Sequence, residues 1–152
     1  MVTSEHVKIV HVLSACLFLG NVVVSGTWAA LAERTRSYEV IAFSNRLVLI
    51  TDLLFTLTGA VLVVITGSMM ATHYGGASSQ SWISWSYLLF SASGLIWALV
   101  LVPIQLRQRT LLKRHQSITE EYLRLSRIWQ IAGAIATLVP LPIVYLMIAK
   151  AR

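Results

Sequence analysis

Four long runs of apolar residues alternate with short polar segments along this 152-residue chain. They cover residues 9–31, 47–71, 83–105 and 128–149. Each run is long enough to cross a hydrocarbon core about 30 Å thick, which takes roughly 20 helical residues. Lipid offers no hydrogen-bond partner to the backbone, and runs of this length are too long for barrel strands. The pattern therefore predicts an all-α fold, a four-helix bundle embedded in a membrane.

The polar segments between the runs are too short to form a second domain. The longest, residues 106–127, cannot bury a core of its own. Its alternation of apolar and charged residues predicts a partly helical loop, and Thr119-Glu-Glu121 suits the first turn of a helix. We expect residues 1–152 to form a single domain.

Composition agrees with a membrane protein and excludes several other classes. The chain is 57% hydrophobic and 12% charged, about half the charged fraction of a typical soluble domain. The net charge of +6 comes from loop lysines and arginines, as expected at an anionic lipid surface rather than on a nucleic-acid-binding protein. The expected partner is therefore the lipid bilayer, with no nucleic acid.

Basic residues are distributed unequally between the two predicted sides. The first and third loops together carry nine: Arg34, Arg36, Arg46, Arg107, Arg109, Lys113, Arg114, Arg124 and Arg127. The other side carries three: Lys8, Lys150 and Arg152. The positive-inside rule predicts a multi-pass protein of the bacterial inner membrane, with loops one and three cytoplasmic and both termini on the outer side.

Tryptophan, proline and glycine positions add detail to this bundle. Trp82, Trp85 and Trp129 lie at the starts of the third and fourth spans and are expected to anchor them at the interface. Proline removes a helical hydrogen bond, so kinks are expected at Pro103, Pro140 and Pro142. Small residues are expected at close helix contacts, among them Gly20, Gly26, Gly59 and Gly67, the last two near one face of their helix.

His11 is one of only two charged or histidine side chains in the first three spans. At that depth it must be solvated, hydrogen-bonded or ligating. It is a candidate axial ligand of haem b, or a ligand for a metal or quinone; the alternative is a hydrogen bond to a neighbouring helix. Met69, Met70 and His73 are expected at the same depth and are the candidate second cofactor ligands.

Asp52 is the second such side chain, about one turn inside the second span. An aspartate there costs a few kcal/mol unless it is paired or hydrated. The expected partners are Arg46 on the same helix, or a basic residue among Arg107, Arg109 and Arg127, with hydroxyl bonds from Thr51 and Thr56. Asp52 with Arg46 is either a structural ion pair or a proton or cation site. Asn21, near the bilayer centre, is expected to hydrogen-bond across helices.

The chain resembles a bacterial family of predicted four-helix integral membrane proteins of unknown function, the 2269 family of domains of unknown function. The resemblance rests on His11-Val-Leu-Ser-Ala15 with Gly20 behind it, on Asp52-Leu-Leu-Phe-Thr56 leading to Thr66-Gly67, and on Leu106-Arg-Gln-Arg109. More distantly, Lys8-Ile-Val-His11 is similar to the first helix of copper-resistance D-type domains. It is also similar to that of the bacterial haem-binding membrane protoporphyrinogen oxidase. This second resemblance implies haem ligation by His11.

Three functions remain open on these observations. The first is a haem-b-binding or redox-associated membrane protein that uses His11. The second is a non-catalytic accessory or assembly subunit of a membrane complex. The third is a small proton or solute transporter that uses Asp52, for which a homodimer is expected because four helices make a narrow pore. No phosphate loop, zinc cluster, nucleophile elbow or paired carboxylates occur, so no catalytic residue is assigned and an enzyme is not the favoured class.

Overall fold

The computed structural model describes residues 4–149 and is all-helical over that range. Four helical stretches are long and apolar enough to cross a membrane: Ser4–Arg34, Tyr38–Tyr74, Ser81–His115 and Glu120–Ala149. They contain the four predicted spans and extend beyond them. The fold prediction is confirmed. Lys150 and Arg152, counted in the prediction of orientation, lie outside the described residues.

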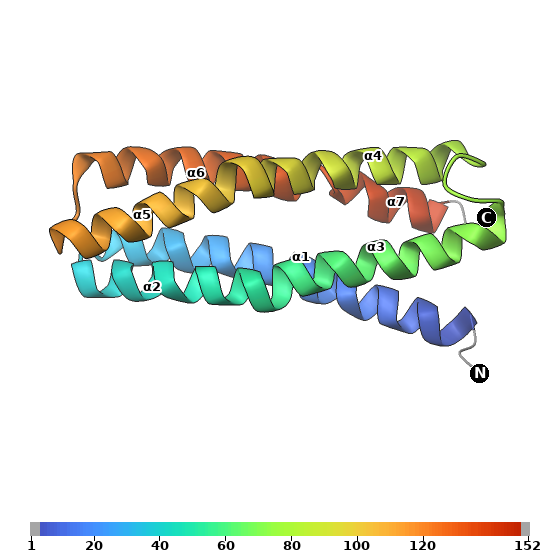
Figure 1. Cartoon of the computed structure of the whole chain (residues 1–152), viewed down its shortest axis with the longest axis horizontal. Coiled ribbons are helices and arrows are strands. Elements are labelled where there is room, and N and C mark those ends of the chain that lie inside the picture. Colours follow the sequence, from blue (N-terminus) through green and yellow to red (C-terminus); the bar gives the residue numbers. More distant parts are fainter. Residues whose placement is uncertain (1–3, 150–152) are drawn as a thin grey trace.

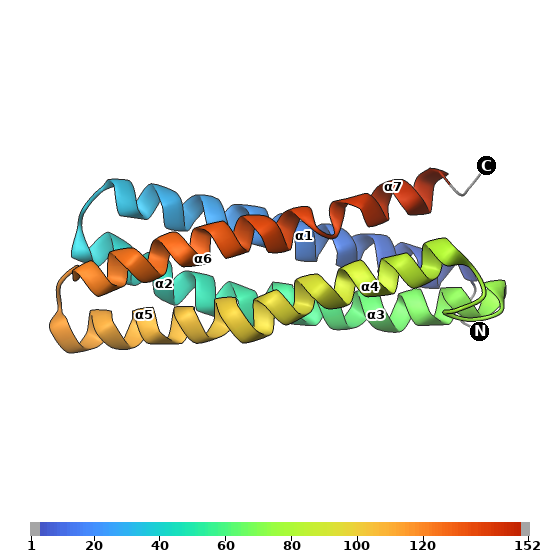
Figure 2. The same ribbon diagram turned by 90° about the horizontal axis from the view of Figure 1, so that it is seen from above.

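The stretches run up and down alternately along one long axis (Figures 1 and 2). The turns between α1 and α2 and between α5 and α6 lie at one end, which we call the basic end because Arg34, Arg36 and Arg114 lie in or beside these turns. Helix α1 begins and α7 ends at the opposite end, beside the connection from α3 to α4. We call this the terminal end.

The first stretch is one helix, α1 (Ser4–Arg34), and the others are interrupted. The second comprises α2 (Tyr38–Thr51), the π-helical η1 (Asp52–Leu57), α3 (Thr58–Ala71) and the short η2 (Thr72–Tyr74). The third comprises α4 (Ser81–Ile96), the π-helical η3 (Trp97–Leu101) and α5 (Val102–His115). The fourth comprises α6 (Glu120–Leu138) and α7 (Leu141–Ala149).

The interruptions have causes in the sequence. Pro103 cannot donate a backbone hydrogen bond, and η3 ends two residues before it. Pro140 separates α6 from α7, so the predicted break in the fourth span is confirmed. No proline lies in η1, whose first residue is Asp52. Wide π turns inside helices occur frequently at functional sites.

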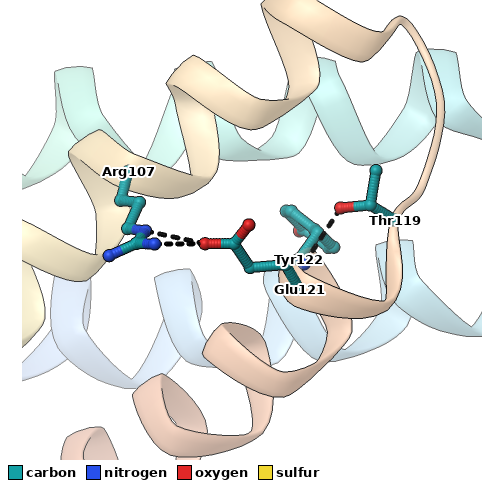
Figure 3. Close-up of polar contacts among 4 residues, drawn as sticks. All are labelled: Arg107, Thr119, Glu121 and Tyr122. Atoms are coloured by element: carbon teal, nitrogen blue, oxygen red, sulfur yellow. Dashed lines mark hydrogen bonds and ion pairs between the residues drawn. The ribbon is translucent and has the colours of Figure 1, made fainter.

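The basic end is closed by two caps and an ion pair. The side-chain oxygens of Ser37 and Thr119 accept hydrogen bonds from the backbone N–H groups of Val40 and Tyr122, at 3.5 and 3.2 Å. These bonds cap the first turns of α2 and α6. Arg107 on α5 pairs with Glu121 on α6 (Figure 3). Both side chains are well exposed, so the pair contributes at most about 1 kcal/mol. The predicted helical third loop is confirmed.

The interior of the bundle is rich in small and polar side chains. Most long apolar side chains point outward, for example Leu13, Leu99 and Tyr145, which are 64–72% exposed. The buried positions include many small or polar side chains, such as Ser25, Thr56, Gln105 and Ser126. This arrangement suits lipid, which solvates apolar side chains while polar ones bond between helices.

Helix α1 packs along α3 through glycine. A Cβ atom at Gly59 would lie 3.1 Å from both the Cβ of Phe18 and the carbonyl oxygen of Ser14, and one at Gly67 would lie 3.2 Å from Cε1 of His11. The expectation for these two glycines is confirmed. The expectation for Gly20 and Gly26 is wrong, because a Cβ atom at either would meet no atom within 4 Å.

Candidate functional site

The Asp52 carboxylate lies inside the bundle, 7% exposed, where α2 widens into η1. Its Oδ1 accepts hydrogen bonds from Nδ2 of Asn21 at 3.2 Å and from the hydroxyl of Thr56 at 3.0 Å. Asn21 Nδ2 also donates to Thr56 at 2.8 Å. The predicted cross-helix bond of Asn21 and the predicted bond from Thr56 are confirmed, and together they tie α1 to η1.

The second carboxylate oxygen is held from the other side of the bundle. Gln105 on α5 donates from Nε2 to Oδ2 of Asp52 at 2.8 Å. The indole of Trp97, on η3, interacts with the same carboxylate without a hydrogen bond of normal geometry. Both π-helical segments therefore contribute to this site, and Asp52 joins three of the four long stretches.

The prediction that Asp52 pairs with an arginine is wrong. Arg46 is exposed, and among residues 4–149 the ion pair present is Arg107 with Glu121. The hydroxyl of Thr51 bonds with Ser25 at 3.3 Å and with the carbonyl of Val48, instead of with Asp52. Neutral donors, not a cation, surround the carboxylate. It therefore keeps the capacity to take up a proton or a positive charge.

A groove of about 550 Å³ leads to this carboxylate. Its walls come from α1 and α6, and its floor includes Asp52, Trp97 and Gln105. Small residues on both walls, Gly26 and Gly133, leave it open. Its volume is in the range of small-molecule binding sites.

The groove faces the lipid side of the bundle. Leu31 and Leu138, on opposite walls, are 52% and 62% exposed, and such apolar rims are solvated by hydrocarbon. Arg34 lines the groove at its basic end. Trp129, which we expected at the interface, is only 8% exposed and lines the groove wall instead. Its expected role as an anchor is therefore wrong.

Glu33 forms a second polar cluster that the sequence did not reveal. It lies beyond the last apolar residue of the first run, but α1 continues to Arg34 and keeps Glu33 half-buried. Its carboxylate accepts hydrogen bonds from the hydroxyl of Ser126 and, at 2.9 Å, from Nε2 of Gln130. The polar residues Ser126 and Gln130 near the start of the fourth span are the signal that could have indicated a buried partner.

His11 is buried between α1 and α3, with its ring against Gly67. Its Nδ1 lies 2.8 Å from the hydroxyl oxygen of Thr66. That hydroxyl donates its one proton to the carbonyl of Leu62 at 2.5 Å. Nδ1 must therefore carry the proton in its bond to Thr66, which leaves Nε2 with a free lone pair. This is the tautomer of a histidine that binds a metal through Nε2.

The candidate second ligands do not share the burial of His11, which is 7% exposed. Met69 and His73 are exposed, and Met70 is half-buried. Over residues 4–149, no three His, Cys, Asp or Glu side chains are grouped so as to hold a metal ion. Neither the groove nor the smaller cavity beside Glu33 includes His11 among its lining residues.

These features define a multi-pass, four-helix integral membrane protein with a polar site inside the bundle. Residues 5–151 match the family model of a predicted integral membrane protein, DUF2269. The chain belongs to this family, as the resemblance of its motifs indicated. It has no match among curated proteins or among solved structures.

Proposed function

We propose that this protein binds a small amphiphilic cation at Asp52 and carries it, or a proton in its place, within the membrane. The observation that supports this proposal best is the position of a carboxylate without a basic partner, among the described residues, at the floor of a lipid-facing groove. A buried ionisable group in a membrane is most often functional.

The chemistry around Asp52, as distinct from that around Arg34 at the basic end of the groove, favours a cationic ligand over an anionic one. The amide and hydroxyl groups of Asn21, Thr56 and Gln105 donate to the carboxylate, while its own oxygens can accept further hydrogen bonds. Trp97 and Trp129 add aromatic faces near it, and an indole face attracts a cation by roughly 0.5–2 kcal/mol. The apolar walls accommodate the rest of an amphiphilic molecule.

The proposal is tested by equilibrium binding of tetraphenylphosphonium, a lipophilic cation, to the detergent-purified protein. Asp52→Asn is expected to abolish saturable binding, because the amide has the shape of the carboxylate without its charge. Glu120→Gln removes an exposed acid of the basic end and serves as the matched control. The proposal is wrong if Asp52→Asn, shown to be folded by circular dichroism, binds the cation as wild type does.

A second candidate function, haem b binding through His11, is supported by one observation. The bond to Thr66 leaves Nε2 of His11 available as an axial ligand. The geometry favours Asp52 more, since the groove reaches Asp52 and not His11. A Soret band in protein purified from haem-supplied cells, lost in His11→Ala, would support the haem function; colourless protein would count against it.

In the third function, an accessory subunit, the protein would co-purify with a membrane complex.

A further inference from the structure

Two arginines flank the groove where it reaches the basic end. Arg34 lies on the α1 wall and lines the groove. Arg127 lies on α6, three, seven and eleven residues before Gln130, Ala134 and Leu138, which line the opposite wall. This spacing puts Arg127 on the groove side of α6, about one turn nearer the basic end than Gln130. Both arginine side chains are exposed.

A contact between α1 and α6 places the two arginines on the same side of this helix pair. Glu33 accepts a hydrogen bond from the hydroxyl of Ser126, so positions 33 and 126 face each other. The next residue on each helix is Arg34 or Arg127. Helix α1 runs toward the basic end and α6 away from it (Figure 2). Because the helices are antiparallel, one step along each turns both positions to the same side, where the groove opens.

No carboxylate forms an ion pair with either arginine in the described part of the chain. Among residues 4–149 the ion pair present joins Arg107 to Glu121. The neighbouring carboxylate, Glu33, accepts hydrogen bonds from Ser126 and Gln130 and lines the small interior cavity rather than the groove. The mouth of the groove therefore carries two positive charges. A guanidinium group matches phosphate in both charge and hydrogen-bond geometry.

Beyond this mouth the groove is apolar and as deep as one leaflet of a membrane. It continues along α1 from Arg34 to Val22, which is about 18 Å at 1.5 Å per residue. A hydrocarbon core is about 30 Å thick, so the acyl chains of one leaflet fill roughly half of that depth. Leu31 and Leu138 on the rims are 52% and 62% exposed. A basic mouth followed by an apolar groove matches the two parts of a phospholipid.

We propose that the groove binds an anionic phospholipid, with its phosphate between Arg34 and Arg127 and one acyl chain along the apolar walls. Basic pockets between membrane helices bind anionic headgroups in this way. Arg34 lies nine residues from Ser25, which bonds to Thr51 beside Asp52, so the phosphate lies about 14 Å along the axis from that level. Lipid and cation thus use different charges, and each can bind without the other.

The test is native mass spectrometry of the full-length protein in a nonionic detergent, titrated with dioleoyl phosphatidylglycerol in the absence of any lipophilic cation. The Kd of the first bound lipid is expected to be about fivefold lower than for dioleoyl phosphatidylethanolamine, which has the same chains and no net charge. Arg34→Gln and Arg127→Gln should each raise the Kd of phosphatidylglycerol about fivefold, the effect of one basic residue near an anionic lipid.

Arg46→Gln is the matched control for the loss of one positive charge. Arg46 is exposed, and it lies outside the groove. Its depth is similar to that of the two arginines, because the adjacent Asn45 lines the same small cavity as Glu33. Arg46→Gln should bind phosphatidylglycerol as wild type does.

The position of the acyl chain is tested with two glycines of α1. A Cβ atom at Gly26 or at Gly20 meets no atom within 4 Å, so a side chain can be added at either position without a clash at Cβ. Gly26 lines the groove and Gly20 does not. Gly26→Leu is expected to fill the groove and weaken phosphatidylglycerol binding severalfold, whereas Gly20→Leu should bind the lipid as wild type does.

Circular dichroism identifies the variants that are folded, and either arginine variant suffices. Equal binding of the two phospholipids, or equal Kd values in Arg34→Gln, Arg127→Gln and Arg46→Gln, would overturn the proposal. Unaltered binding in Gly26→Leu would also overturn it. Displacement of the lipid by glycerol phosphate, which has no acyl chain, would mean that the arginines bind a soluble phosphate ester instead. Asp52→Asn should keep the preference for phosphatidylglycerol, so this proposal and the cation site can fail separately.

Discussion

Gln105 and Asp52 lie on two different stretches of the bundle and are joined by a bond of 2.8 Å from Nε2 to Oδ2. Gln105 is 2% exposed and Asp52 is 7% exposed, so neither group has bulk water as an alternative partner. Through this bond α5 holds Oδ2 of the carboxylate, while α1 and η1 hold Oδ1.

Removing the Gln105 amide should destabilise the bundle. Gln105→Leu leaves Oδ2 of Asp52 without its donor, and an unsatisfied buried acceptor costs about 1–3 kcal/mol. The free energy of unfolding in mixed detergent micelles is expected to fall by this amount. Thr110→Ala, on the exposed face of the same helix, should have a much smaller effect. Equal losses for the two variants would contradict the assigned role of Gln105.

The α1–α3 contact should tolerate no side chain at Gly59. Its Cβ would press against the backbone oxygen of Ser14 and against Phe18, and overpacking of this kind typically costs about 1–3 kcal/mol. Gly59→Ala is therefore expected to lower stability. Gly20→Ala meets no neighbour within 4 Å and should be neutral or slightly stabilising. If Gly20→Ala lowered the stability more than Gly59→Ala does, the helices would have to pack differently.

The tautomer of His11 can be read directly. In ¹⁵N spectra of histidine-labelled protein, His11 is expected to be a neutral ring protonated at Nδ1, because Thr66 accepts that proton. Thr66→Val removes the acceptor and should abolish this preference. His11→Gln identifies the signal. A wild-type ring protonated at Nε2 would remove the structural support for ligation through that nitrogen.

Orientation in the membrane follows from the positions of basic residues and remains a prediction. In a Cys16→Ala background, Ser78→Cys lies at the terminal end and Ser117→Cys at the basic end, and both positions are exposed. A membrane-impermeant thiol reagent is expected to label position 78 in intact cells and position 117 only after permeabilisation. The opposite pattern would place the basic end outside.

The sequence predicted the helices well because hydropathy and length alone define a membrane span. It predicted the Asp52 site only in part. Thr56 and Asn21 were expected to bond, since buried hydroxyls and amides need partners. The arginine partner was inferred from depth, but depth does not say which face of a helix a residue occupies, and the chain uses Gln105 instead. Glu33 was missed because helix α1 continues to Arg34, beyond the end of the apolar run at residue 31.

Asp52 is expected to bind a positive charge in the groove, and this binding can be observed directly. Asp52 is its only aspartate, so protein labelled with ¹³C at the aspartate carboxyl gives one such signal, identified by its loss in Asp52→Asn. On titration with tetraphenylphosphonium, we predict a saturable shift of this signal. A signal that stays unchanged at cation concentrations that saturate binding would contradict the claim.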